Sequence, residues 1–432
     1  MPLQTLTFAF ATERGTPAAL TEHRCKAAVP FGGKYRVIDF ILANCLHSGL
    51  RQILVLTQYK SHSLHKHLRD GWSLFAAELG QFITPVPPQM RESSSWYAGA
   101  IDALRQNRYL IERSPARTLL LLDAGLIYRM DYAELVRFHR EQGAGITCAL
   151  RHAGGANLPA PMAVELADGA RIVGLRPVRG EPADTNGEPP GCILEPLLGP
   201  AQADPMTSTA AYLATMGVVV IEKALLLEEL DALAATAAAT TEVTVGNLAV
   251  QLLAPLLERG RTDIAAYGFG GARGRVTPDR YWSDLGDTDA YFRANMDLLK
   301  ADPPLDLYQP DWNIITYQGQ YPPARTVPGP VSGNEGIFVN SMLAAGTVIR
   351  GGGVSHSVLY PQVQVDDRAI VDEAILCDGV QVGAGAEVRR CICDKDVVIS
   401  PGAQIGVDRA ADAARFEVSP NGIVVVRKGQ RV

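Results

Sequence analysis

The sequence predicts an α/β protein: a Rossmann-like domain with a mostly parallel sheet, followed by a C-terminal left-handed parallel β-helix. Two observations lead to this prediction. In the first two-thirds of the 432 residues, short apolar runs alternate with longer runs whose apolar residues have helical spacing. In the last quarter, aliphatic residues recur at six-residue steps, which is typical of hexapeptide β-helices.

The strands expected in the first domain are buried apolar runs, at Gln4–Ala11, Leu50–Thr57, Thr118–Leu122 and Gly145–Arg151. Between them, Asp102–Glu112 and Tyr132–Gln142 have the spacing of amphipathic helices. Strands that alternate with helices form a parallel sheet covered on both faces. Ligands are therefore expected in the loops beyond the carboxyl ends of the strands.

We place the first domain at residues 1–300, a Pro-, Asp- and Tyr-rich linker at 301–330, and the β-helix at 331–432. The six-residue steps fall in four sets: Val348 and Val354; Leu359, Val365 and Val371; Leu376, Val382 and Val388; Ile392 and Val398. Three or four ordinary alternating strands are the alternative. Because a solenoid has open ends and flat faces, this domain is also expected to support subunit assembly.

The composition narrows the function classes. Apolar residues make up 47% and charged residues 20%, as in ordinary globular proteins, and the net charge of −6 argues against a general nucleic-acid binder. The seven scattered cysteines indicate reduced thiols, and Cys391 and Cys393 have no second pair nearby to complete a zinc site. No apolar run approaches the ~20 residues of a membrane span, and Glu13 follows the first apolar run too soon for a secretory signal. We expect a cytoplasmic protein without membrane partners.

A resemblance to a known family rests on six motifs in order. They are Ala27–Trp72 (AAVPFGGKYR and onward), Trp96–Asn107 (WYAGAIDALRQN), Ile127–Tyr132 (IYRMDY), Thr215–Val219 (TMGVV), Tyr281–Gly286 (YWSDLG) and the β-helix tail. Together they closely resemble the bacterial ADP-glucose pyrophosphorylases, or glucose-1-phosphate adenylyltransferases. That family makes ADP-glucose and pyrophosphate from ATP and glucose 1-phosphate for glycogen synthesis.

The resemblance also implies roles for single residues. In this reaction the sugar phosphate attacks the α-phosphorus of ATP and pyrophosphate leaves in line, so catalysis depends on positioning and on neutralising negative charge. Asp284 matches a carboxylate that holds Mg²⁺, and Lys26 and Asp102 match catalytic-domain positions. Matches to substrate-binding positions are Tyr97, Arg176, Thr215, Gly15 and Thr16.

The sequence departs from the family in three parts of the catalytic site. In the first loop, Thr12 and Glu13 replace paired glycines and Pro17 replaces an arginine, so that a carboxylate stands where a phosphate has to bind. After Thr118–Leu122, Gly125 stands at the position of the metal-binding aspartate. Asp123 lies two residues earlier, and a displacement of ~6.6 Å along a strand is too large for it to replace that ligand directly.

The third departure lies in the sugar-phosphate motif F-x-E-K-P. Here Gly174–Pro177 places Leu175 at the glutamate and Arg176 at the lysine. Upstream, Pro159–Met162 replaces the family's F-G-V-M segment.

The family's effector site, in contrast, looks intact. It binds anionic metabolites such as fructose 1,6-bisphosphate or AMP between the two domains, and its positions match Arg24, Lys34, Arg36, Ser63, Arg389 and Arg390. His23 replaces a family lysine there. Gln58 and Trp96 match positions thought to pass the effector signal to the substrate site. The alternative is that these are solvated surface charges.

The leading hypothesis is therefore an effector-binding, catalytically impaired subunit that forms a tetramer with a catalytic paralogue. One alternative is an active adenylyltransferase with a rebuilt phosphate loop, which requires Mg²⁺. Another is a repurposed metabolite-binding protein or a nucleotidyltransferase of changed specificity. An acyltransferase of the hexapeptide-repeat type would leave the large first domain without a role.

Overall fold

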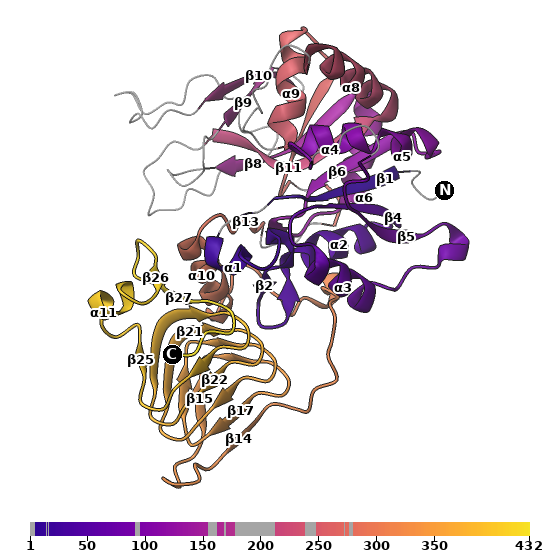
Figure 1. Ribbon diagram of the computed structural model, residues 1–432. Coiled ribbons are helices and arrows are strands. Elements are labelled where there is room, and N and C mark those ends of the chain that lie inside the picture. Colours follow the sequence, from indigo (N-terminus) through magenta and orange to yellow (C-terminus); the bar gives the residue numbers. More distant parts are fainter. Residues whose placement is uncertain are drawn as a thin grey trace.

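A nine-stranded sheet and a β-helix form the two parts of the computed structural model (Figure 1). The structure describes residues 5–13, 15, 17–90, 96–153, 162–167, 170–177, 212–237, 248–271, 273–275 and 280–432. Within these ranges, no helix is long and apolar enough to cross a membrane. The predicted fold class is confirmed.

The sheet of the first domain has the strand order β5, β4, β1, β6, β11, β8, β12, β10, β9. The bounds are β1 Thr5–Ala11, β4 Gln52–Thr57, β5 Phe82–Val86, β6 Thr118–Asp123, β8 Ile146–Ala153, β9 Met162–Ala167, β10 Arg171–Pro177, β11 Tyr212–Glu222 and β12 Ile264–Gly268. β10 and β11 run antiparallel to their neighbours, whereas β5, β4, β1 and β6 are parallel. The sheet is mixed and mostly parallel, and the four predicted strands are all present.

Helices cover both faces of this sheet and divide its core in two. One cluster of buried side chains includes α2 (Val37–His47), α3 (His62–Gly71), α6 (Tyr132–Gln142) and α10 (Thr288–Met296). The other includes α4 (Ala100–Gln106), α5 (Arg108–Arg113), α8 (Lys223–Ala237) and α9 (Leu248–Glu258). The short helix α1 (Ala18–Thr21) and the 3-10 helix η1 (Lys26–Ala28) follow β1. The 3-10 helices η2 (Ala77–Leu79) and η3 (Asp297–Leu299) lie before β5 and after α10.

The two predicted helices differ in outcome. α6 has the predicted bounds because Asp131 caps its N-terminus by accepting from the N–H of Ala133, and Gly143 ends it in the left-handed region. The predicted helix Asp102–Glu112 is instead two helices, α4 and α5, which meet at Asn107. Asn107 is buried, and its amide donates to the Tyr97 hydroxyl and to the Ala103 carbonyl. These tertiary contacts explain a break that helical spacing does not show.

The C-terminal domain consists of short parallel strands, consistent with a left-handed β-helix of hexapeptide type. One sheet contains β14 (Arg325–Val327), β17 (Val348–Arg350), β20 (Gln364–Val365), β22 (Gln381–Val382) and β24 (Val398–Ile399). The other contains β15 (Ile337–Val339), β16 (Met342–Leu343), β18 (Gly353–Ser355), β19 (Val358–Leu359), β21 (Ile370–Leu376), β23 (Glu387–Cys393), β25 (Gln404–Ile405), β26 (Glu417–Val418) and β27 (Val424–Val426). Helix α11 (Arg409–Ala413) precedes β26. Because β14 already pairs with β17, the coil begins inside the predicted linker.

One face of the β-helix joins the core of the first domain. Val358, Ile375 and Ile392 stack in successive coils and belong to the same buried cluster as Tyr291 and Phe292 of α10. The two domains therefore share one hydrophobic core at their interface.

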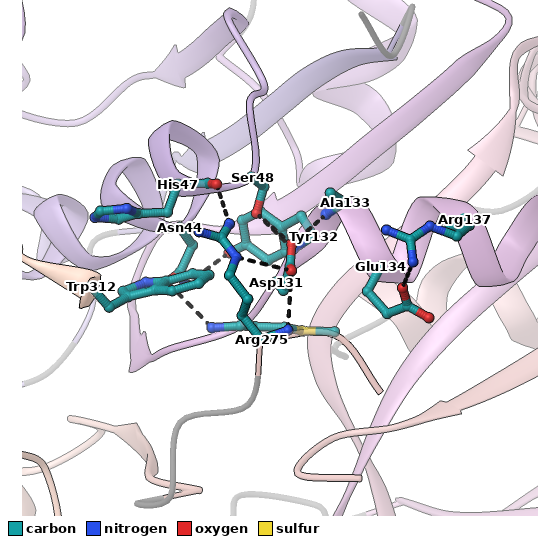
Figure 2. Close-up of polar contacts among 11 residues, drawn as sticks. Asn44, His47, Ser48, Asp131, Tyr132, Ala133, Glu134, Arg137, Arg275 and Trp312 are labelled. Carbon is teal, nitrogen blue, oxygen red and sulfur yellow. Dashed lines mark hydrogen bonds and ion pairs between the residues drawn. The ribbon is translucent and has the colours of Figure 1, made fainter. Parts of the chain in front are cut away.

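The linker between the domains is anchored to the first domain by Trp312 of the 3-10 helix η4 (Pro310–Trp312). The Trp312 ring stacks on His47 at 4.9 Å and lies under the Arg275 guanidinium at 4.6 Å, and its Nε1–H donates to Asn44 (Figure 2). Arg275 also donates to the His47 carbonyl and to Asp131. This linker is a fixed structural element.

Candidate functional site

The loops that follow β1 and β6 lie at the same edge of the sheet. These strands are parallel neighbours, with Phe10 opposite Asp123 in the register. A third segment reaches this edge because β13 (Trp282–Asp284) pairs with β7 (Leu126–Tyr128), which places Asp284 opposite Leu126. The carboxyl ends of parallel strands are where ligands bind in open α/β sheets, so the predicted position of the site fits the fold.

Lys26 is the central cation of this edge. Its ammonium forms an ion pair with Asp284, and its side chain is 7% exposed. Burial opposes the charged form, but Asp284, Asp123 and Glu13 outweigh burial and raise the pKa of Lys26 above its usual value. A small cavity is lined by Phe10, Ala11, Glu13, Lys26, Ala27, Asp123 and Gly125. Lys26 and Asp284 are thus brought together as predicted, with Glu13 and Asp123 beside them.

Asp123 experiences an excess of negative charge. Burial, Glu13 and Asp284 raise its pKa to about 7, while Lys26 and the N–H of Gly125 act in the opposite direction. Three carboxyl groups therefore act on Lys26: Glu13 and Asp123, which line the cavity, and Asp284, which forms its ion pair.

The carboxylate of Asp123 folds back over Gly125. Its Oδ1 accepts the N–H of Gly125 at 2.8 Å, which is an Asx turn. A Cβ added at Gly125 would lie 3.2 Å from this oxygen and 3.0 Å from Cδ of Lys26. The displacement expected along a straight strand does not describe this segment, because the chain turns immediately after Asp123. That Asp123 cannot replace the metal ligand directly stays a prediction. An aspartate at 125 would bring its Cβ into tight contact with the carboxylate of Asp123, which would have to shift by a few tenths of an ångström.

Gly15 is packed against Lys26. Its φ is +72°, and an added Cβ would lie only 2.6 Å from Cβ of Lys26. Glycine is required here for both conformation and space. The adjacent Thr16 and Arg14 lie outside the described residues.

The predicted sugar-side residues are held by local contacts. Tyr97 is buried, and its backbone N–H donates to Oε1 of Gln58 at 2.5 Å. Asp102 accepts from the N–H of Ala98 and from Arg105 at the start of α4. Gln58, which directly follows β4, is therefore bonded to the segment before α4, whereas Trp96 is 56% exposed. The coupling role of both residues stays a prediction.

The remaining substrate positions lie on β10 and β11. Thr215 is buried on β11, two residues before Gly217, whose backbone lies against Cβ of Asp123. Arg176 pairs with Glu165 at 3.6 Å on the outer hairpin, and about half of each side chain is exposed. Of Pro159–Met162, only Met162 is described.

Sequence reasoning missed one residue that supports Asp284. Arg151 of β8 lies 3.7 Å above the ring of Trp282, whose Nε1–H donates to the Met216 carbonyl. This contact holds β13 against the sheet. An arginine on a predicted strand gave no signal of such a role.

A second pocket lies between the domains and contains part of the predicted effector set. It has a volume of about 320 Å³ and is lined by Lys34 and Arg36 from the first domain and by Lys395 and Asp378 from the β-helix. Burial lowers the pKa of Arg36, although Asp39 and Asp378 oppose this. Its guanidinium donates to the backbone carbonyl of Ser63, and this hydrogen bond helps to fix the position of the Arg36 side chain. We call this the effector pocket.

Arg24 lies in a buried ion pair between the domains. Its Nη2 donates to both carboxylate oxygens of Asp394, at 2.9 and 2.8 Å, and the two side chains are 5% and 2% exposed. Burial opposes the charge, but Asp394 and other neighbours raise the pKa of Arg24 overall. Nη1 is buried and has no hydrogen-bond partner among the described residues.

Arg389 and Arg390 are not brought to the effector pocket. Arg389 pairs with Glu387 at 2.6 Å and with Asp372 at 3.4 Å. Arg390 lines a different cavity, of about 580 Å³, on the α10 side of the interface. The residues that the sequence analysis missed in the effector pocket include the ionisable His67, Asp378 and Lys395. Lys395 had no distinguishing spacing in the tail.

The sheet, the phosphate-side loop and the hexapeptide domain define a nucleotidyltransferase with a C-terminal β-helix. Two family models agree: "Nucleotidyl transferase" matches residues 18–156, and "GlmU-like, C-terminal hexapeptide" matches residues 322–426.

Full-length relatives identify the family. The chain is 44% identical to glucose-1-phosphate adenylyltransferase 2 of Vibrio cholerae over 407 residues, covering 94% of this chain and 93% of the relative. It is 36% identical to glucose-1-phosphate adenylyltransferase of Methylococcus capsulatus, covering 99% and 95%. It is 34% identical to that of an Enterobacter strain, covering 99% and 94%. The chain belongs to the glucose-1-phosphate adenylyltransferase family.

Proposed function

We propose that the chain is an effector-binding subunit of an ADP-glucose pyrophosphorylase of glycogen synthesis, with weak turnover of its own, and that it assembles with a catalytically complete paralogue. The observation that carries this proposal is the carboxylate of Glu13 beside Lys26 and Asp123.

The charge balance at this edge opposes triphosphate binding. Glu13, Asp123 and Asp284 surround a single lysine, and Pro17 stands where the family has an arginine. A carboxylate ~4 Å from a phosphate charge costs about 1 kcal/mol in water and about 4 kcal/mol at a partly buried site. Since about 1.4 kcal/mol is a factor of ten in rate, Glu13 alone is expected to slow the reaction by one to three orders of magnitude.

Mg²⁺ would reduce this repulsion, and the site has the one or two carboxylates that this ion needs as protein ligands. Among the described residues no three His, Cys, Asp or Glu side chains form a metal-binding group. Mg²⁺ is, however, often held by one or two carboxylates with water and substrate phosphates. Asp284 and Asp123 would be these carboxylates, and the ion would polarise the phosphates of ATP. Lys26 would then bind substrate phosphate as an ammonium, while Tyr97, Thr215 and Arg176 are the proposed glucose 1-phosphate contacts.

The effector pocket supports the regulatory part of the proposal. Lys34 and Arg36 from the first domain and Lys395 from the β-helix line this pocket, where Lys395 pairs with Asp378 at 2.9 Å. A metabolite carrying two phosphates would neutralise these cations and would contact both domains. Nη1 of Arg24 offers a further buried donor close to Arg36.

The test is pyrophosphate release by the purified chain, alone and co-expressed with a catalytically complete paralogue. We expect low activity alone, co-purification, and a changed effector response of the mixed assembly. Glu13→Gly should raise the rate at least tenfold, and Glu78→Gly, which removes an exposed carboxylate at η2, is the matched control. Normal turnover of the chain alone, or no association with the paralogue, would refute the proposal.

A second candidate, an active glucose-1-phosphate adenylyltransferase, is favoured by Asp123. Its carboxylate fills the space beside Gly125, so the loss of the family's aspartate is compensated at least sterically. This candidate predicts full turnover by the single chain. It also predicts that Asp123→Asn and Asp284→Asn each weaken Mn²⁺ binding, measured by electron paramagnetic resonance. Mn²⁺ binding that is unchanged in Asp123→Asn would exclude a ligand role for Asp123.

A further inference from the structure

The face of the β-helix that joins the first domain is bordered by two rows of corner residues. On one side, Pro361, Asp378 and Lys395 of successive coils line the effector pocket. On the other side, the residues that follow the paired positions Val339, Ser355, Asp372 and Arg389 form a second row: Asn340, His356, Glu373 and Arg390. All four have φ between +42° and +48°, and all four line the 580 Å³ cavity against α10.

We propose that this second cavity, which we call the α10 cavity, binds a monophosphate ester with a flat apolar body. The inference goes beyond the proposed function, since it requires neither weak turnover nor occupancy of the effector pocket. The cavity volume lies within the range of about 300–1,000 Å³ that is usual for small-molecule sites.

The apolar part of the ligand is indicated by the residues of the first domain. Phe292 and Met296 of α10, Leu299 of η3, and Ile423 before β27 all line the cavity. These side chains form an apolar wall. An apolar ring that packs against it leaves water, and this burial stabilises the bound ligand. A free phosphate ion would make no use of this wall.

The phosphate is indicated by the charges that line the same cavity. Arg293, Lys300 and Arg390 are cationic, and Asp289 and Glu373 are acidic. Asp289 is already engaged, because it accepts from the Ser419 hydroxyl and from the N–H of Asn421.

The arginines at this cavity are available to a ligand. Arg293 is exposed and has no ion-pair partner among the described residues. Nη2 of Arg390 donates to the Asn421 carbonyl at 3.1 Å, whereas its Nη1 lies 3.7 Å from Glu373, beyond hydrogen-bond distance, and half of the side chain is exposed. A phosphate placed between Arg293, Lys300 and Arg390 would form charge-assisted hydrogen bonds.

The charge balance distinguishes the two pockets. The lining of the α10 cavity has three cations against two carboxylates, and Lys300 also pairs with Asp297 at 2.7 Å, which leaves Arg293 and Arg390 as the main cations for a single phosphate. Among the described residues that line the effector pocket, Lys34, Arg36 and Lys395 stand beside one carboxylate, Asp378, which pairs with Lys395 at 2.9 Å. This larger excess of positive charge suits two phosphates. Each site is built from both domains, so a ligand in either one is expected to stabilise their contact.

The experiment measures binding to the full chain by isothermal titration calorimetry, with 4-nitrophenyl phosphate, inorganic phosphate and fructose 1,6-bisphosphate as probes. We expect 4-nitrophenyl phosphate to bind at least tenfold more tightly than inorganic phosphate. Arg293→Ala should weaken 4-nitrophenyl phosphate at least fivefold and leave fructose 1,6-bisphosphate unchanged. Lys34→Ala, at the effector pocket, is the matched control and should have the opposite pattern.

Both substitutions remove exposed side chains, and Lys300→Ala provides a second variant if Arg293→Ala unfolds. Equal affinity for 4-nitrophenyl phosphate and inorganic phosphate, or unchanged affinity in the folded variants, would overturn the proposal. If only fructose 1,6-bisphosphate fails to bind, the effector part of the proposed function fails and the α10 cavity stands.

Discussion

The buried ion pair between Arg24 and Asp394 offers a quantitative test of how the two domains are joined. Asp394→Asn removes the charge but preserves the shape of the side chain, so the Arg24 guanidinium remains buried without a counter-charge. With the two side chains only 5% and 2% exposed, the expected loss is on the order of 3–5 kcal/mol, as for other broken buried pairs.

The assay must measure the loss of stability at the domain interface separately, because a two-domain chain does not unfold in a single two-state step. Urea unfolding gives the overall change, and hydrogen–deuterium exchange locates it. We expect faster exchange in residues 24–28 and 391–395, with the far side of the sheet at β5 unaffected. Arg69→Ala is the control: it breaks the exposed pair with Asp70 and should cost less than about 1 kcal/mol.

A double substitution separates the net contribution of the ion pair from the penalty of leaving the Arg24 charge buried and unpaired. Arg24→Met with Asp394→Leu replaces the pair by apolar groups, and should recover much of the stability lost in Asp394→Asn. If Asp394→Asn stays within about 1 kcal/mol of the wild type, water reaches this pair and a buried ion pair does not join the two domains.

Three further predictions concern other parts of the chain. Gly15→Ala should destabilise the protein by roughly 1–3 kcal/mol, because of the positive φ and the collision with Lys26, and a thermal melt no lower than the wild type would contradict this. Trp312→Ala should cost about 3–5 kcal/mol and should expose residues 301–324 to limited proteolysis; unchanged resistance would show that the linker is held elsewhere. Burial lowers the pKa of His139 below its usual 6.5, despite the hydrogen bond with Glu222, so the unfolded chain binds the proton more readily. The free energy of unfolding should therefore fall as the pH drops below about 6.5, and His139→Gln should reduce that slope; an equal slope in the variant would refute this assignment.

The six-residue period predicted the β-helix but not which residue of each apolar pair points inward. Leu359, Val365, Val371, Leu376, Val382 and Val388 are buried inside the coil as predicted. In two coils Ile349 and Ile399 are the buried core residues, next to the predicted Val348 and Val398, which are only partly buried. Each pair is two adjacent aliphatic residues, so the spacing alone fits either one.

Ile392 shows a different limit of the same reasoning. It recurs at the predicted step and is fully buried, yet it packs in the cluster shared with the first domain, while Cys391 and Cys393 fill the coil. A hydrophobic outer face is indistinguishable from a core position in one sequence. Only the docked first domain shows why Ile392 is apolar.

The sequence predicted which strands carry the residues of the catalytic edge, but it did not predict the turn at Asp123–Gly125. The sequence placed Lys26, Asp284 and Glu13 in one site, and the structure brings them together. Spacing along an ideal strand does not apply to Asp123, because its own side chain closes the turn over Gly125. Such a turn is signalled locally by an aspartate two residues before a glycine, a weaker pattern than the strand that precedes it.

The separation of the effector residues follows from the geometry of one coil. Arg390 and Lys395 are five residues apart, but Cys391–Cys393 between them forms the strand that faces the first domain. The two side chains therefore stand at opposite corners of the same interface, and no single small ligand joins them.

Because both corners contact the first domain, two ligands that strengthen this contact should bind with positive coupling. Fructose 1,6-bisphosphate should accordingly tighten 4-nitrophenyl phosphate binding in the wild type, and Asp394→Asn, which loosens the shared interface, should change that coupling without removing either pocket. Independent binding of the two probes would show that the corners do not communicate.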